Sequence, residues 1–187
     1  DIGPPEKRSA TCTRDLDDFL EQFARVYFQT IAQAVHQADP NHLYLGCRFA
    51  ASPAPVVRAA AAFVDVLSFN IYRDSAGCAE YDGLGKPVLI GEFHFGATDR
   101  GMLHPGLVET ASQEARATAY AAFVKGAATC PAIVGTHWFQ YVDEPVTGRW
   151  YDGENYNIGF VDVTDAPYPE LVRAATEVHQ QIYTLRH

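Results

Sequence analysis

A glutamate and a histidine end the apolar run PVLIGEFHFGA, residues 87 to 97. Charged side chains are rarely placed in such runs without a partner or a role. Glu92 is therefore the first candidate for chemistry, because a carboxylate can attack a carbon centre or exchange a proton. A simpler alternative is an ion pair between Glu92 and Arg48 in the interior of the protein.

Polar or aromatic side chains end each of the four apolar runs that we interpret as strands. The runs and these side chains are 42–49 with Arg48, 65–72 with Asn70 and Tyr72, 86–95 with Glu92 and His94, and 132–141 with His137, Trp138 and Gln140. Active sites of α/β barrels form at the carboxyl ends of the strands. Residues two apart on a strand share a face, so several of these side chains are expected to project together. Four such strand ends in succession predict a site.

Helices are expected between and around these strands. The apolar spacing predicts helices over 15–38, 52–64, 111–128 and 168–185, with residues 1–14 as a loop or truncated end. Thr110 and Gln113 fit a capping box at the start of the third helix. Apolar strands alternating with helices indicate a parallel α/β sheet, either open and doubly wound or part of a (β/α)8 barrel. Whole barrels take about 250 residues, so four strands predict half a barrel, with residues 1–187 as one partial catalytic domain.

Composition limits the classes of partner. The 187 residues carry a net charge of −9, which argues against nucleic acid or an anionic membrane as the main partner. No apolar stretch approaches the roughly 18 residues of a membrane span. The four cysteines form no CxxC pair, which argues against a thiolate metal site, and Cys47 is expected to be a small buried residue. The acidic pairs Asp143-Glu144 and Asp152-Glu154 are interpreted as solvated loop charges.

The residue types at the strand ends favour hydrolysis of a glycosidic bond. A glutamate that accepts a hydrogen bond from a tyrosine can attack an anomeric carbon, while an aromatic face at Trp138 would stack on the sugar. Hydroxyl contacts would come from Arg48, Asn70, His94 and Gln140. A retaining enzyme also needs a second carboxyl group about 5–5.5 Å from the nucleophile. Alternatives are a metal site made by Glu92, His94 and His137, or histidines that merely fill the core.

Longer motifs resemble the β-agarases of glycoside hydrolase family 50. They are LYLGCRFA, DVLSFNIY, PVLIGEFHFGATDRGMLHPGL and GTHWFQYVDEPVTGRWYDGENYNIGFVDVTDAPYPE, and the resemblance covers most of residues 15–180. It implies a (β/α)8 barrel of a retaining clan that cuts β-1,4 links of agarose or a related galactan oligosaccharide. It implies no metal or organic cofactor. Because polymeric galactans cannot enter a cell, we expect a secreted or periplasmic protein.

The resemblance also implies roles for individual residues. The four strands become barrel strands five to eight, with Glu92 as the nucleophile, Tyr72 as its hydrogen-bond partner and Trp138 as the aromatic platform. Glu154 and Asn155 of DGENYN fall in a loop that borders the same cleft, and His137 joins the substrate contacts.

One residue of the family pattern has no counterpart in this sequence. The acid/base of such barrels is a glutamate that follows an asparagine at the end of strand four, and this sequence contains no Asn-Glu pair. The N-terminal half of the barrel is therefore expected from the same protein, a separate chain or a second copy. Glu154 can take the acid role only if its loop folds inward. The rival hypotheses are a non-catalytic or degenerate sugar-binding half-barrel, and a metal-dependent hydrolase.

Overall fold

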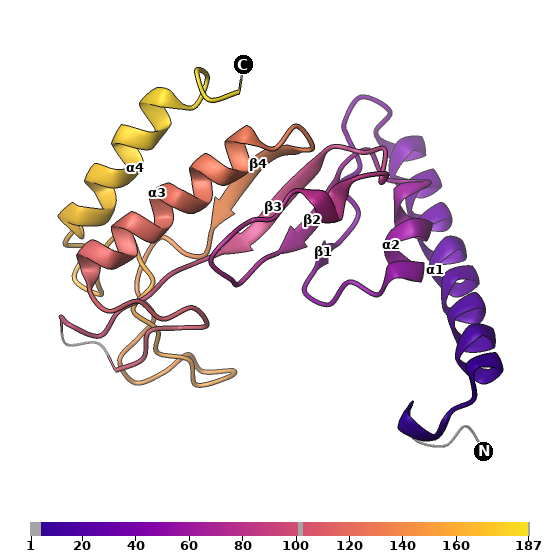
Figure 1. Cartoon of the computed structure of the whole chain (residues 1–187), viewed down its shortest axis with the longest axis horizontal. Coiled ribbons are helices and arrows are strands. Elements are labelled where there is room, and N and C mark those ends of the chain that lie inside the picture. Colours follow the sequence, from indigo (N-terminus) through magenta and orange to yellow (C-terminus); the bar gives the residue numbers. More distant parts are fainter. Residues whose placement is uncertain (1–4, 101–102, 187) are drawn as a thin grey trace. The chain divides into compact units, whose positions relative to one another are not determined.

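Helices alternate with the strands of one sheet in the computed structural model, which describes residues 5–100 and 103–186 (Figure 1). The elements are the short 3-10 helices η1 (Pro5–Lys7) and η2 (Ala79–Tyr81), the helices α1 (Ala10–Ala38), α2 (Ala54–Ala61), α3 (Gln113–Thr129) and α4 (Pro169–Gln181), and the strands β1 (Arg48–Phe49), β2 (Leu67–Asn70), β3 (Val88–Phe93) and β4 (Ile133–Trp138). The sheet order is β1-β2-β3-β4, and β3 pairs with β4 in parallel. The predicted α/β class with a parallel sheet is confirmed.

The chain divides into two compact units, and each is described by itself. The first unit comprises residues 1–68 and 83–87, and the second comprises 69–82 and 88–187. Strand β2 contributes to both units. All of the expected site residues except Arg48 belong to the second unit.

Helix α1 dominates the first unit and begins earlier than the sequence predicted. The Ser9 side chain accepts a hydrogen bond from Cys12 N at 3.1 Å, so it caps a helix that starts at Ala10 instead of near residue 15. The helix ends where Asp39-Pro40 predicted, with Asp39 as the C-cap. Its buried residues include Phe28, and α1 packs beside α2 (Figure 1).

The run 42–49 is a strand only at Arg48–Phe49, much shorter than predicted. Gly46 has a φ of +65°, a left-handed conformation that ends an extended run. A Cβ at Gly46 would also lie 2.7 Å from Val64 Cγ1. The prediction for Cys47 is wrong as well, because its side chain is exposed in this irregular segment.

Helix α3 packs between β4 and α4 in the second unit (Figure 1). Phe93 at the end of β3 stacks on Phe123 of α3, with ring centroids 4.2 Å apart. Tyr120, one turn earlier on α3, stacks on the same ring at 5.9 Å. The helix-facing side of the sheet is therefore an aromatic core, which fixes the side of β3 on which alternate residues lie.

The predicted capping box at the start of α3 is wrong. Ser112 is the N-cap, and its hydroxyl accepts a hydrogen bond from Ala115 N at 3.2 Å. Thr110 instead donates to the carbonyl oxygen of Gly96 at 2.9 Å. Gln113 is buried and donates to Asn157 Oδ1 at 2.7 Å. Both residues serve tertiary contacts that sequence spacing does not show.

A disulfide joins Cys78 to Cys130 across a sequence separation of 52 residues. It links the segment after β2 to the C-cap of α3, both in the second unit. The sequence analysis did not predict this bond. Separately, none of the helices in the described ranges has the length and apolar character needed to cross a membrane.

Replacing Cys78 and Cys130 by alanine is expected to lower the free energy of unfolding by about 2–4 kcal/mol, because the cross-link restricts the unfolded chain. Denaturant unfolding measures this change, with the exposed Cys47→Ser as the matched control. Thiol titration of the unreduced, denatured protein should find two free thiols among the four cysteines. Four free thiols would contradict the structure.

Candidate active site

The end of β3 carries a carboxylate held by a phenol. Tyr72 Oη donates a hydrogen bond to Glu92 Oε2 at 2.6 Å. The backbones beside them are also joined, because Ile71 N donates to the carbonyl oxygen of Glu92 at 2.8 Å. Glu92 alternates with Phe93 and therefore projects from the face opposite the aromatic core. The structure thus brings together the two residues expected to make the nucleophile and its partner, and leaves both half-buried.

His94 is placed as a core residue with both ring nitrogens engaged. Its Nε2 accepts a hydrogen bond from Leu107 N at 2.8 Å, so Nδ1 carries the hydrogen and donates to the carbonyl oxygen of Phe139 at 3.1 Å. The residue is 1% exposed, and burial lowers its pKa to about 4. Gly106, with a φ of +80°, passes so close that a Cβ would lie 2.7 Å from Nε2. This arrangement favours the core-histidine alternative over a sugar contact.

Trp138 lies on the helix-facing side of the sheet. It is the register partner of Phe93, and neighbouring partners on adjacent strands share a face. Its ring centroid is 5.1 Å from Phe93 and 5.3 Å from Tyr120, and its indole N–H donates to the Ile158 carbonyl oxygen at 2.8 Å. The half-buried indole therefore packs against core rings on the α3 side of the sheet, which disagrees with the expected platform beside Glu92.

The other expected contacts are spread over two units. Asn70, Gln140, Glu154 and Asn155 are half-buried and His137 is exposed, all in the second unit, whereas Arg48 is exposed on β1 in the first. Asn70 Oδ1 is buried without a hydrogen-bond partner.

A row of rings connects Glu92 and Tyr72 to the loop between β4 and α4, residues 139–168, which we call the β4–α4 loop. The Tyr72 and His94 rings are 4.6 Å apart, and His94 is 6.1 Å from Tyr156 of this loop. Tyr156 also lies 4.7 Å from His104, and Asn157 N donates to the His104 carbonyl oxygen. The segment DGENYN is therefore packed against the neighbours of Glu92.

One arginine gathers the acidic residues of the β4–α4 loop. Arg149 forms ion pairs with Asp152 at 2.6 Å, with Glu144 at 3.1 Å, and with Glu154. Glu144 is 0% exposed, and its burial raises the pKa of its carboxyl group. Its Oε2 accepts a hydrogen bond from Tyr156 N at 2.9 Å. The interpretation of these acids as solvated loop charges is wrong for Glu144 and also for Asp143, which is 4% exposed.

A buried polar network holds the β4–α4 loop against α3. Arg116, 0% exposed, donates to the carbonyl oxygen of Phe95 at 2.8 Å and to that of Gly159. Asp143, also buried, accepts hydrogen bonds from Gly159 N at 2.7 Å and from Tyr168 Oη at 2.6 Å. Sequence reasoning missed this network. Its one visible signal was an arginine on a predicted helix between otherwise small and apolar neighbours.

The alternative metal site is not formed in the described part of the chain. Within residues 5–100 and 103–186, no three His, Cys, Asp or Glu side chains gather closely enough to bind a metal ion. His94, which that site requires, has both ring nitrogens bonded to backbone groups.

Comparison with known proteins extends this description. No protein-family profile matches the chain. Beta-agarase B of Vibrio sp. (strain JT0107) is 44% identical over 185 residues, which cover 96% of this chain and 19% of that protein. Beta-agarase A of the same organism is 47% identical over 179 residues, covering 90% of this chain and 18% of that protein. The chain therefore matches a segment of the β-agarases.

A solved structure supports the same match. An exo-β-agarase is 48% identical with a TM-score of 0.91, over 96% of this chain and 25% of that one. The resemblance to the β-agarases is thus confirmed, and the chain spans about a fifth of the length of the relatives Beta-agarase A and B.

The burial of His94 predicts a dependence of stability on pH. Its pKa of about 4 in the fold lies below its ordinary value of 6.5, so the unfolded chain binds a proton first as pH falls. The free energy of unfolding is therefore highest above pH 6.5, where His94 is neutral in both the folded and the unfolded chain. It decreases as the pH falls from 6.5 toward 4, because only the unfolded chain binds the proton there. Between pH 7 and pH 5, the protonation of this histidine in the unfolded chain lowers the free energy of unfolding by about 2 kcal/mol.

Urea unfolding at pH 7 and pH 5 tests this dependence on the protein and on His94→Gln. The variant, which keeps a donor and an acceptor but does not titrate, should lose less stability on acidification. The matched control is His42→Gln, because the His42 side chain is 82% exposed. Equal losses in the parent protein and in His94→Gln would contradict the account.

Proposed function

We propose that this chain supplies the nucleophile-bearing part of a retaining glycoside hydrolase that cleaves β-1,4-galactosidic links of agarose-type galactans. The observation that carries the proposal is the hydrogen bond from Tyr72 Oη to Glu92 Oε2 at the end of β3. It occurs in a chain of which 96% aligns with Beta-agarase B at 44% identity. This hydrogen bond restricts the positions that the carboxylate can take, and nucleophilic attack benefits from such a restriction.

The reaction proceeds by double displacement. A carboxylate oxygen of Glu92 bonds to the anomeric carbon while the bond from that carbon to the leaving oxygen breaks, and a general acid gives the leaving oxygen its proton. The same group, now a base, takes a proton from water. The water oxygen then bonds to the anomeric carbon and releases the Glu92 carboxylate. Tyr72 holds the carboxylate in position in both steps.

The general acid/base is proposed to lie outside this sequence. Support comes from the absence of an Asn-Glu pair in these 187 residues. In this proposal the four strands are strands five to eight of a (β/α)8 barrel, and a partner N-terminal half supplies the other four strands with the acid/base. That partner is part of the same protein, a separate chain or a second copy.

The substrate contacts are proposed from the residues that remain accessible. Candidates for hydrogen bonds to sugar hydroxyls are Arg48, Asn70, His137, Gln140, Glu154 and Asn155. His94 and Trp138 are proposed to act indirectly, because the structure uses their polar atoms to fix neighbouring backbone segments. In this proposal, His94 and Trp138 position the ends of the strands that carry the candidate substrate contacts.

The protein is proposed to work outside the cytoplasm, either secreted or in the periplasm. The supporting observation is the disulfide between Cys78 and Cys130, since such bonds persist mainly in oxidising compartments. A polymeric substrate, which cannot enter a cell, agrees with this location.

Release of reducing sugar from agarose tests the proposed function in the enzyme that carries this sequence. Glu92→Gln should reduce turnover by roughly a thousandfold or more, because the amide cannot form the glycosyl ester. Tyr72→Phe should reduce it by about tenfold to a hundredfold, the value of one hydrogen bond to a charged group. Glu114→Gln, an exposed carboxylate paired with Arg173, is the matched control and should leave turnover unchanged.

Full turnover by Glu92→Gln would refute the role of Glu92 as nucleophile. Turnover by residues 1–187 alone that depends on Glu92 would refute the proposal that the acid/base lies elsewhere. Oligosaccharide binding that persists in Glu92→Gln without turnover agrees with the proposal.

A further inference from the structure

An unusually exposed tryptophan lies in the β4–α4 loop. Trp150 is 94% exposed, and Tyr151 beside it is 59% exposed. Their ring centroids are 5.4 Å apart and the rings are nearly perpendicular. The 94% exposure of Trp150 leaves its indole faces open despite this contact. Trp and Tyr are enriched at binding interfaces, so this adjacent exposed pair is a candidate contact surface.

These rings continue a row that begins at the end of β4. The guanidinium of Arg149 lies over the ring of Phe139 at 5.8 Å and over the ring of Tyr151 at 4.8 Å. Phe139 follows β4 directly and its carbonyl oxygen accepts the hydrogen bond from His94. The ring of Phe139, the guanidinium of Arg149 and the rings of Tyr151 and Trp150 therefore form a continuous row of contacts, which begins beside His94.

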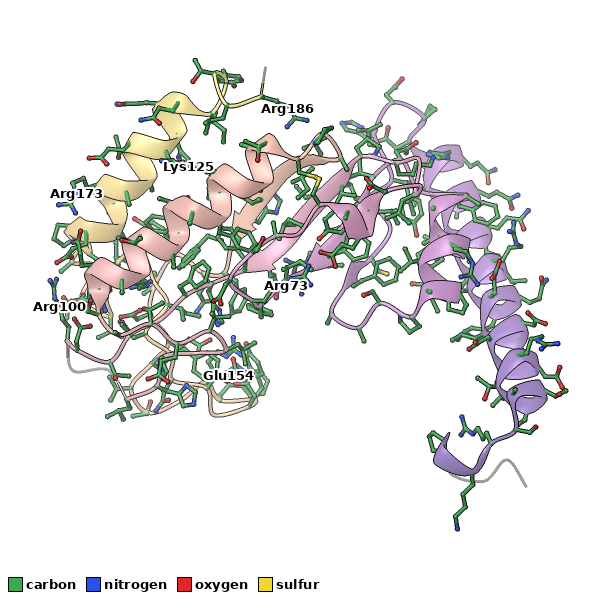
Figure 2. All side chains as sticks on the ribbon, viewed as in Figure 1. Arg73, Arg100, Lys125, Glu154, Arg173 and Arg186 are labelled. Atoms are coloured by element: carbon green, nitrogen blue, oxygen red, sulfur yellow. A yellow bond between two sulfur atoms is a disulfide. The ribbon has the colours of Figure 1, made fainter. Side chains whose placement is uncertain are left out.

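The turn that carries Trp150 is fixed before any ligand binds. Arg149 N donates to the Glu154 carbonyl oxygen, and Gly153 N donates to the Arg149 carbonyl oxygen, both at 2.8 Å. The Arg149 side chain is also paired with Asp152, Glu144 and Glu154. Figure 2 labels Glu154 in this looped region of the second unit, at the opposite end from Arg186. A pre-ordered turn reduces the entropy lost on binding.

The charges around Trp150 select the class of ligand. Three carboxylates surround a single guanidinium, so the turn repels anions such as nucleic acid or an acidic peptide. An open indole face suits a neutral ring with C–H groups on one side, which describes a pyranose of a galactan chain. The same loop carries Tyr156, which packs against His94, so a sugar chain bound at Glu92 can extend along it.

We propose that Trp150 and Tyr151 form a second carbohydrate subsite, which stacks on a galactan sugar beyond the one that reacts with Glu92. The proposal rests on the proposed function, because it assigns the same substrate class to a further part of the loop. Its role is to bind long substrates more tightly than short ones. Trp150 supplies the stacking face, and Tyr151 and Arg149 hold that face in position.

Calorimetric binding of neoagaro-oligosaccharides tests the subsite in the enzyme that carries this sequence, with Glu92→Gln present to prevent turnover. Trp150→Ala should weaken the binding of a six-sugar ligand by roughly tenfold and leave a two-sugar ligand unaffected. Trp150→Phe keeps a flat ring and should restore most of the affinity. Tyr183→Ala is the matched control, because Tyr183 is also a strongly exposed aromatic residue, at 82% exposure. This variant should bind all of the ligands as tightly as the parent does.

Two results would overturn the subsite. One is unchanged six-sugar affinity in Trp150→Ala, as expected if another part of the enzyme covers this ring. The other is an equal loss for both ligand lengths, which indicates damage to the loop as a whole. Failure of the proposed function has a different result, because the enzyme with Glu92 intact would then not hydrolyse agarose. In that case, a loss of affinity in Trp150→Ala for the six-sugar ligand alone would still establish the subsite. A parent that binds no six-sugar ligand would overturn both.

Discussion

The buried guanidinium of Arg116 is the constraint on which the arrangement of the second unit depends. A charged group with no exposure must be held by hydrogen bonds, because an unpaired charge in the interior costs several kcal/mol. Arg116 meets this need with the carbonyl oxygens of Phe95 and Gly159 and with Gln113 Oε1. These partners belong to the segment after β3, the β4–α4 loop and α3. One side chain therefore fixes the three segments that surround the end of β3.

The chemistry of the site follows from which face each residue takes. Phe93 and Trp138 are register partners and pack toward α3, so Glu92 must project from the other face, where Tyr72 meets it. His94 shares that side of the chain but is sealed by Leu107 and the Phe139 carbonyl oxygen. The candidate carboxylate thus stands on β3, and the neutral His94 directly after this strand binds the backbone of the surrounding loops. Such support is what keeps a catalytic group in a productive orientation.

Much of this fold could be predicted because apolar runs and helical spacing are local properties. The runs that became β2, β3 and β4 and the four helices were found from the sequence, whereas the pairing of Tyr72 with Glu92 came from the resemblance to the β-agarases. The face taken by Trp138 could not be predicted, since it depends on the register between β3 and β4 and not on alternation within one strand. The partners of Arg116, and the bond between Cys78 and Cys130, join residues far apart in the sequence. Gly46 shows a local failure, where one left-handed residue shortened a strand that composition alone favoured.

The most direct test of the account is to identify the residue that becomes covalently bonded to the sugar. A 2-deoxy-2-fluoro galactoside with a good leaving group slows the second step of a retaining glycosidase, so the glycosyl-enzyme accumulates and its peptides can be sequenced by mass spectrometry. The account predicts a single label on Glu92, within residues 88–97. A label on another carboxylate, or hydrolysis of agarose with inversion at the anomeric carbon, would contradict it.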